Sequence, residues 1–189
     1  MSANKVTFGL RNVHIAFMTS EVTPAWEVPE AIKGAVRITP TANGGTETFY
    51  ADDSKYFVIT TNNGYDVELE LANVPDTVLA EMLGWEIDDN GMLVETQDAQ
   101  PKPFALMGEV QGDAKARRFV YYNCKASRPA KERSTKGETT TPQTDVLQMS
   151  VSPIELNSKR IVKGDMELSA TNATAYNGFY TAVYTPVFA

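Results

Sequence analysis

The clearest pattern in this chain is a strict alternation of apolar and polar residues between residues 65 and 71. Side chains alternate between the two faces of a β-strand, so this pattern predicts a strand with one buried face and one hydrated face. The hydrated face is unusual because it consists of carboxylates, with no Lys or Arg between them on the strand. The apolar members are Tyr65, Val67, Leu69 and Leu71, and the carboxylates are Asp66, Glu68 and Glu70.

Other alternating and β-branched runs predict a mainly β protein of the α+β class. The Asn-Asn-Gly at 62–64 predicts a turn that joins the first strand to the β-branched run at 55–61 as a hairpin. Asn90-Gly91 predicts a second hairpin, and a turn at 111–113 predicts a third, in which Cys124 shares a face with Val120 and Tyr122. Further strands are expected at 6–17, 35–38, 147–151, 161–168 (with Gly164 as a candidate bulge) and 179–184.

One segment changes from strand to helical spacing. Asn73 is a candidate N-cap, Pro75 suits a first helical turn, and Gly84 is typical of a helix end. The residues that fall on one helical face are Val78, Leu79, Met82 and Leu83. The spacing therefore predicts a short amphipathic helix that lies on the sheet.

Residues 128–144 are polar throughout and predict a long loop. Loops longer than about 12–15 residues are uncommon in compact domains and are usually functional or disordered. We interpret this segment as an inter-subunit loop, because a neighbouring subunit would be the natural partner to hold it. Its candidate contact residues are Arg128, Lys131, Arg133, Lys136 and Thr140.

Composition narrows the class of protein. The 189 residues are 42% hydrophobic and 22% charged, as expected for one soluble domain spanning 1–189. The net charge of −7 argues against general affinity for nucleic acid or anionic lipid. No apolar run approaches the ~20 residues of a membrane helix, and no secretory signal is expected at the N-terminus. Acidic residues gather between 47 and 98 and basic ones between 115 and 136, so copies of the chain could attract one another.

The sequence offers few residues of the types that most catalytic sites use, apart from its many carboxylates. His14 is the single histidine and Cys124 the single cysteine, whereas a zinc site needs three or four such ligands. We therefore expect no enzyme activity, no catalytic or metal residues and no cofactor. Three alternatives stay open: a β-sandwich module that binds a ligand or carbohydrate, a small carboxylate-dependent hydrolase, and a nucleic-acid binder that uses the basic segment with Tyr121 and Tyr122.

Six short segments occur in one order across most of the chain. They are Lys5-Val6-Thr7-Phe8-Gly9-Leu10-Arg11-Asn12-Val13-His14, Phe49-Tyr50-Ala51-Asp52-Asp53, Asn62-Asn63-Gly64-Tyr65, Asp88-Asp89-Asn90-Gly91, Gln100-Pro101-Lys102-Pro103-Phe104-Ala105 and Tyr122-Asn123-Cys124-Lys125-Ala126-Ser127-Arg128-Pro129. In these segments and in their order, the chain resembles the major tail proteins, or tail tube proteins, of long-tailed non-contractile bacteriophages.

The resemblance implies a β-sandwich or partial-barrel core with one short flanking helix. It implies that six copies form a ring whose inner strands join into one larger barrel, and that rings stack into the hollow tail of the virion. DNA would pass through during ejection without specific binding, other tail proteins would meet the tube ends, and assembly would take place in the host bacterial cytoplasm. The resemblance carries no catalytic residue and no membrane contact.

Two site hypotheses follow from combining the residues with the resemblance. Asp66, Glu68 and Glu70 would line the lumen and repel DNA, although the opposite sheet face is an alternative lining. The loop 128–144 and a C-terminal strand or arm at 176–189 would clamp neighbouring subunits.

Overall fold

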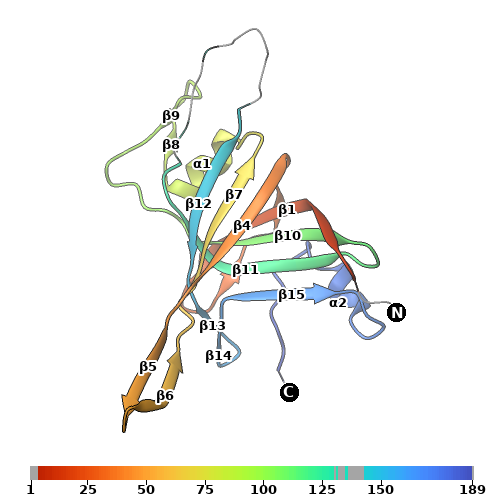
Figure 1. Ribbon diagram of the computed structural model, residues 1–189. Helices are drawn as coiled ribbons and strands as arrows, with labels where there is room; N and C mark the ends of the chain where they lie inside the picture. Colours follow the sequence, from red (N-terminus) through yellow and green to blue (C-terminus); the bar gives the residue numbers. More distant parts are fainter. Residues whose placement is uncertain (1–3, 130, 132–134, 136–142, 189) are drawn as a thin grey trace.

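The computed structural model describes residues 4–129, 131, 135 and 143–188, and it confirms a mainly β fold (Figure 1). The described helices are α1 (Asp76–Leu83) and α2 (Ala173–Asn177). The described strands are β1 (Thr7–Ser20), β2 (Ala25–Trp26), β3 (Glu30–Ala31), β4 (Ala35–Asn43), β5 (Thr46–Ala51), β6 (Ser54–Thr60), β7 (Gly64–Leu71), β8 (Glu86–Ile87), β9 (Leu93–Val94), β10 (Phe104–Gly112), β11 (Arg117–Ala126), β12 (Asp145–Val151), β13 (Ile154–Leu156), β14 (Lys159–Ile161) and β15 (Lys163–Glu167).

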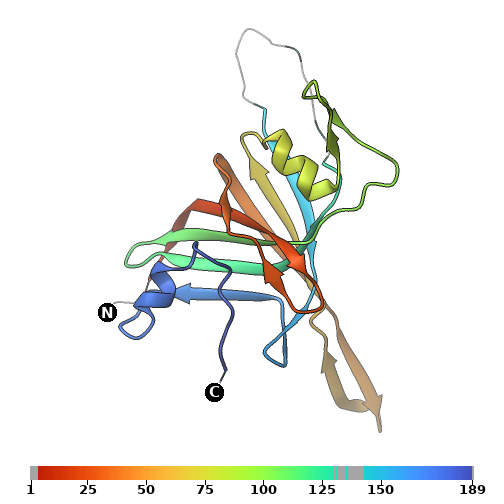
Figure 2. The same ribbon diagram turned by 180° about the vertical axis from the view of Figure 1, so that it is seen from behind.

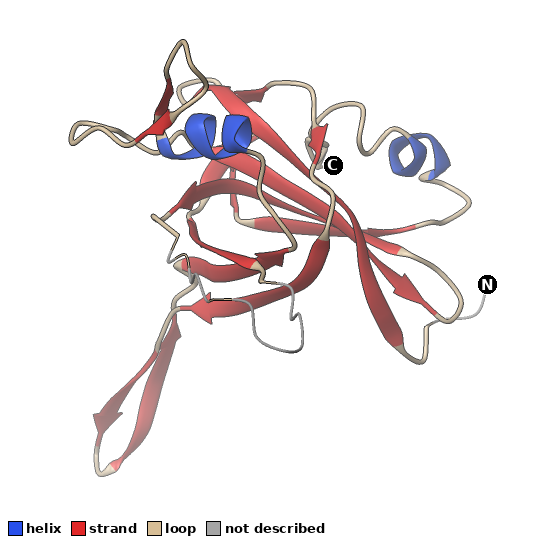
Figure 3. Cartoon of the chain, turned by 90° about the horizontal axis from the view of Figure 1, so that it is seen from above, coloured by secondary structure: helices blue, strands red, loops and turns tan. Residues whose placement is uncertain are grey.

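One antiparallel sheet organises the fold, with the strand order β2-β1-β10-β11-β12-β7-β4. The long strand β11 pairs with β15 along its first half, from Arg117 to Tyr121, and with β12 along its second half, from Cys124 to Ala126. Because its two halves have different neighbours, the sheet curls after β11, and β4 at the far edge comes close to β1. The view from above shows this curled, partly closed barrel (Figure 3).

The main hydrophobic core fills the inside of the curled sheet. The inward side chains of β7 meet those of β1, β10, β11 and β12, and α1 covers one end of the barrel with its apolar face. The predicted helical face is confirmed, since Val78, Leu79, Met82 and Leu83 are all buried. Gly84 ends α1 in a left-handed conformation with φ of 70°, also as predicted.

A second apolar cluster lies on the outer face of β1, β10 and β11. The C-terminal segment after α2 crosses this face, and Phe179 is fully buried against Met107 and Tyr122. The Tyr122 hydroxyl donates a hydrogen bond to the Tyr184 carbonyl at 3.0 Å. The C-terminal segment is thus packed on the body of the subunit.

The largest correction concerns the segment before β7. The expected hairpin between 55–61 and β7 is wrong, because β6 pairs with β5 while β7 pairs with β4 and β12. The residues from β4 to β7 form one long two-stranded ribbon that turns at Asp52-Asp53, where φ is 50° and 56°. The Asn-Asn-Gly at 62–64 is therefore a bend in this ribbon and not its turn.

Five smaller expectations also need correction. The segment 179–184 forms no strand among the described residues, and α2 is a second helix. Asn73 makes no capping hydrogen bond to α1. Gly164 lies in regular register with Val120, so it is not a bulge. A register shift in β11 places Cys124 with the inner cluster and leaves Val120 and Tyr122 in the outer one.

Candidate functional site

The three carboxylates of β7 lie on the open face of the sheet, as the alternation predicts. Asp66 is exposed and Glu68 and Glu70 are partly buried, while Val67, Leu69 and Leu71 face the core. Neighbouring strands place polar residues beside each carboxylate. The cross-strand rows are Thr41–Asp66–Ser150, Thr39–Glu68–Gln148 and Arg37–Glu70–Val146.

Arg37 of β4 supplies the positive charge that β7 itself lacks. Its Nη2 atom lies 2.8 Å from Glu68 Oε1, and its Nε atom lies 3.2 Å from Glu70 Oε2. Thr144 donates a hydrogen bond to Glu70 at 2.8 Å, and together with Arg37 it holds the pKa of Glu70 below its ordinary value of 4.5. Glu70 is therefore ionised at neutral pH. Three acidic side chains and one basic side chain, Arg37, lie on this face, so acidic groups are in excess.

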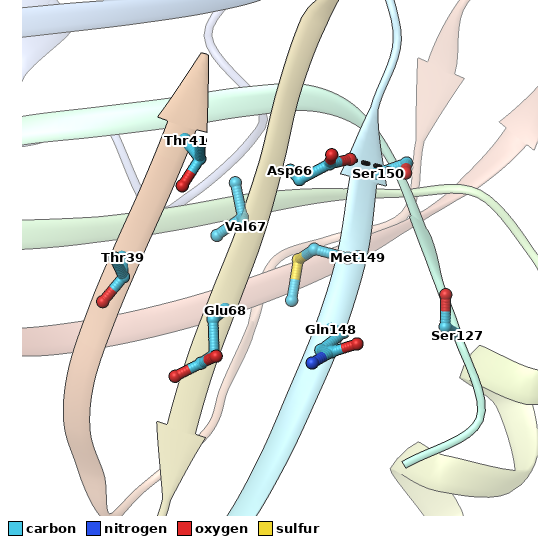
Figure 4. A pocket seen from close by; sticks show the side chains of 9 residues that line it. All are labelled: Thr39, Thr41, Asp66, Val67, Glu68, Ser127, Gln148, Met149 and Ser150. Atoms are coloured by element: carbon cyan, nitrogen blue, oxygen red, sulfur yellow. Dashed lines mark hydrogen bonds between the residues drawn. The ribbon is translucent and has the colours of Figure 1, made fainter. Parts of the chain in front are cut away.

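A shallow polar hollow of about 320 Å³ opens on the same face (Figure 4). Two of its lining residues are hydrogen-bonded to each other, with the Ser150 hydroxyl donating to Asp66 at 2.9 Å. In the part of the chain that the structure describes, no group of three or more His, Cys, Asp or Glu residues could hold a metal ion. The arrangement is a hydrated anionic surface, and most of the residues that line the hollow are cross-strand neighbours on β4, β7 and β12.

The predicted inter-subunit loop is only partly described. Arg128 pairs with Glu95 at 3.0 Å, and Lys131 lies 3.9 Å from Asp145. Both partners belong to the same chain. Arg133, Lys136 and Thr140 lie outside the described residues, and the inter-subunit role of this loop stays a prediction.

A free edge of the sheet, at β4, is the second feature with a bearing on assembly. Among the described strands, β4 pairs with β7 alone, which leaves its other side without a strand. Pro40 has no N–H group, and proline is tolerated at sheet edges for this reason. Val36 is exposed on the same strand. An open edge of this kind can pair with a strand of another chain.

Sequence reasoning missed a buried ionic cluster on the outer face. Glu109 is 2% exposed, and its carboxylate lies 2.6 Å from Arg11 Nε and 2.9 Å from Arg118 Nε. Arg118 also stacks on Tyr176 and Tyr180, with centroid distances of 3.9 and 4.9 Å. These contacts tie the C-terminal segment to the sheet.

The electrostatics of Glu109 follow from its two arginine partners. Burial by itself raises the pKa of this carboxyl, but the hydrogen bonds and charges of Arg118 and Arg11 outweigh burial and bring the pKa below 4.5. The three residues come from β1, β10 and β11, and only the pairing of these strands brings them together. No short sequence motif marks such a cluster.

The single histidine and the single cysteine both lie in packed surroundings. The His14 ring stacks on Tyr180 at 4.3 Å between centroids, and its Nδ1 atom lies 2.9 Å from the Asn12 carbonyl. The Cys124 thiol is fully buried, which raises its pKa and disfavours the thiolate that a nucleophile needs. Across the described residues, neither helix is long and apolar enough to cross a bilayer.

Comparison with known proteins finds a solved structure that shares this fold. No protein-family model matches this chain, and no curated protein matches it. A solved structure of the anti-feeding prophage cap, a tube terminating cap, matches with a TM-score of 0.53 at 8% sequence identity. The match covers 89% of this chain and 96% of that chain. At this identity the likeness shows a shared fold over nearly the whole of both chains.

Proposed function

We propose that this protein is a structural component of a bacteriophage-type tail, in which copies of the chain form rings that stack into a hollow tube. The observation that carries the proposal is the shared fold with a tube terminating cap over almost the full length of both chains. The ordered sequence segments that resemble tail tube proteins support it independently. Six copies a ring, a place in the virion tail and assembly in the host bacterial cytoplasm are parts of this proposal.

The open edge at β4 supports a ring of identical subunits. A strand that pairs on one side only exposes a row of backbone N–H and C=O groups. A ring satisfies these groups by pairing each edge with the next subunit, and the same contact repeats until the ring closes. The curled sheet of one subunit would then become a segment of a larger barrel.

The carboxylate face supports a lumen that DNA can cross. Asp66, Glu68 and Glu70 outnumber Arg37, so this face stays anionic. Duplex DNA carries one negative charge per roughly 1.7 Å of its axis, and a basic wall would retain it. Repulsion between these charges reaches about 8 Å at physiological salt, which is enough to keep a duplex off a narrow wall. No catalytic step is part of this function.

Electron microscopy of the purified protein tests the proposal directly. Negative staining should show rings or hollow tubes. In the virion, other tail proteins would dock at the two ends of such a tube. A monomer at every concentration, with a melting temperature that rises on adding a carbohydrate ligand, would favour the binding-module alternative instead.

The lumen assignment has a separate test. A variant with Lys at positions 66, 68 and 70 should form tubes that retain DNA, and a matched variant with Gln at the same positions should not. Equal DNA ejection by virions that carry either variant would show that another face lines the bore.

A further inference from the structure

The ribbon leaves the body of the subunit at an Asn-Gly-Gly sequence. Asn43 is the last residue of β4, and Gly44 and Gly45 connect it to β5. Beyond this point the β5–β6 hairpin projects from the barrel (Figures 1 and 2). An asparagine that precedes a glycine is prone to lose its side-chain amide, because glycine has no side chain to hinder attack by its own backbone nitrogen. The chain has four such pairs, at 43–44, 63–64, 90–91 and 177–178.

The reaction requires the backbone N–H group of the glycine to lose its proton, and a hydrogen bond from that group opposes the loss. In three of the four pairs the structure provides such a bond. Gly64 donates to Asn62 Oδ1 at 3.1 Å, Gly91 to the Asp88 carbonyl at 2.9 Å, and Gly178 to the Thr174 carbonyl at 3.0 Å. The Gly44 N–H group donates to no described residue. Asn43 is therefore the asparagine whose neighbouring nitrogen is free to react.

The course of the ribbon explains why Gly44 has no partner. Successive residues of an antiparallel strand direct their backbone groups alternately toward the paired strand and away from it. Asn43 and Gly45 face the paired strand, where their carbonyls accept hydrogen bonds from Asn63 N at 2.8 Å and Thr61 N at 2.9 Å. Gly44 lies between them, so its N–H group faces away, on the side where β4 has a free edge. Gly44 is also exposed.

Water has access to this pair. A hollow of about 230 Å³ lies beside it, and its lining includes Asn43 and Gly44. The hydroxyl-bearing residues of the lining are Thr46, Thr60, Thr61 and Tyr65. Among the described residues that line this hollow, none is charged. An amide nitrogen that loses its proton becomes negative, so the distance from carboxylates favours that step.

Asn90 is the nearest competitor, because it lies in an exposed turn. Its setting differs in two ways. The Gly91 N–H group is bonded to the Asp88 carbonyl, and the carboxylates of Asp88 and Asp89 lie just before Asn90 in the chain. Nearby negative charge disfavours a second negative group, so deprotonation of Gly91 N costs more than deprotonation of Gly44 N.

We propose that Asn43 is a site of spontaneous deamidation in the folded subunit. The Gly44 nitrogen gives up its proton and attacks Cγ of Asn43, so that a new C–N bond closes a cyclic imide. The Cγ–Nδ2 bond breaks, and the departing amide nitrogen takes up a proton from solvent and leaves as ammonia. Water then opens the ring at either carbonyl and leaves aspartate or isoaspartate at position 43. Water is the only co-reactant, and the inference does not depend on the proposed tube.

Either product changes the free edge of the sheet. It places a carboxylate at the end of β4, whose outer side has no strand partner among the described residues. Charged side chains on an edge strand oppose pairing with another chain. Isoaspartate also adds an atom to the main chain at the point where the hairpin leaves the barrel. A subunit that has reacted should thus be less able to pair at this edge than a fresh one.

Peptide mapping of the unassembled protein tests the inference. After incubation in mildly alkaline buffer, trypsin should release a peptide spanning 38–55, which contains Asn43 and none of the other three asparagines that precede glycine. Mass spectrometry should detect deamidation there first, with a rate that rises with pH. Asn90 and Asn177 should react about tenfold more slowly, because an ordinary hydrogen bond must break first. Equal or faster reaction at either residue would overturn the inference.

Two controls separate the effect of the fold from that of the local sequence. Asn43→Gln should abolish the product in peptide 38–55, because the longer side chain closes its ring far more slowly, and should leave the other sites unchanged. In guanidinium chloride all four glycine N–H groups lose their partners, so the four rates should converge. A lead of the same size for Asn43 in the unfolded chain would assign the reactivity to sequence alone and would overturn the role of the fold.

Discussion

The two halves of one ribbon differ sharply in burial. Strands β4 and β7 make one half, β5 and β6 the other, and hydrogen bonds run through the junction from Thr61 N to Gly45 O and from Asn63 N to Asn43 O. Strand β7 alternates between buried and hydrated residues, whereas β6 is exposed along its whole length. Both strands are rich in residues that favour β structure. The difference lies in their neighbours, because β12 and the barrel interior cover β7 and no described element covers β6.

The test with the largest expected effect truncates one aliphatic side chain in each half of the ribbon. Leu69→Ala in β7 removes a side chain that is 1% exposed, so we expect a loss of about 3–5 kcal/mol in the free energy of unfolding. Ile59→Ala in β6 should cost less than about 1 kcal/mol, because that side chain is about half exposed. Urea unfolding of the unassembled subunit measures both. Equal losses would show that the hairpin is packed in solution as tightly as the barrel.

The second test compares a buried carboxylate of the body with an exposed one of the hairpin. In Glu109→Gln the Arg118 guanidinium loses its buried carboxylate partner, so the free energy of unfolding should fall by about 3 kcal/mol. Glu47→Gln should be nearly neutral. Because the folded-state pKa of Glu109 lies below 4.5, its contribution is complete above pH 4.5 and is lost as pH falls through the lowered value.

Chemical unfolding at a series of pH values therefore distinguishes the two glutamate variants. Wild type and Glu47→Gln should lose stability steeply below pH 4.5, while Glu109→Gln should show a shallower loss there. Parallel curves for wild type and Glu109→Gln would contradict the ionic role of this cluster.

The third test acts at the bend between the halves. Gly64 has φ of 103°, and a Cβ atom there would lie 1.8 Å from the Val151 carbonyl oxygen. Gly64→Ala should therefore cost about 2 kcal/mol, because the backbone must shift. Gly45 is the matched control, since a Cβ atom there meets no atom within 4 Å. Thermal unfolding should place Gly45→Ala close to wild type, and an equal drop for both alanines would point to flexibility of the bend as the cause.

The smallest expected effect concerns the surface charges of the two halves. Arg37→Ala removes two ion pairs of the body, yet these pairs are solvated, so the loss should stay below about 1 kcal/mol and shrink with added salt. Lys55→Ala in the hairpin should be neutral. Urea unfolding at low and high salt measures both. A salt-independent loss above 1 kcal/mol for Arg37→Ala would show that this face is less hydrated than its exposure indicates.

Local patterns were sufficient for several elements. The alternation at 65–71 predicted that Val67, Leu69 and Leu71 are buried, and the spacing between 75 and 84 predicted α1 and its end at Gly84. The carboxylate face was also predictable, because a two-residue period fixes the side on which Asp66, Glu68 and Glu70 lie. Its lumen role stays a proposal.

Other features depended on contacts between distant segments. The turn residues at 62–64 suggested a hairpin, but pairing of β7 with β4 and β12 made them a bend. A bulge in β11 moved Cys124 to the inner face, and a single-residue shift of this kind reverses every later side chain. Arg11, Glu109 and Arg118 met only because three strands paired.

By itself, the sequence determined the mainly β class, the burial pattern of β7 and the position of α1, because each depends on residues a few positions apart. The tertiary structure alone decided which strands are neighbours, which apolar strand is left uncovered, and which charges meet. Those outcomes depend on packing between segments up to about a hundred residues apart, and local periodicity contains no information about that packing.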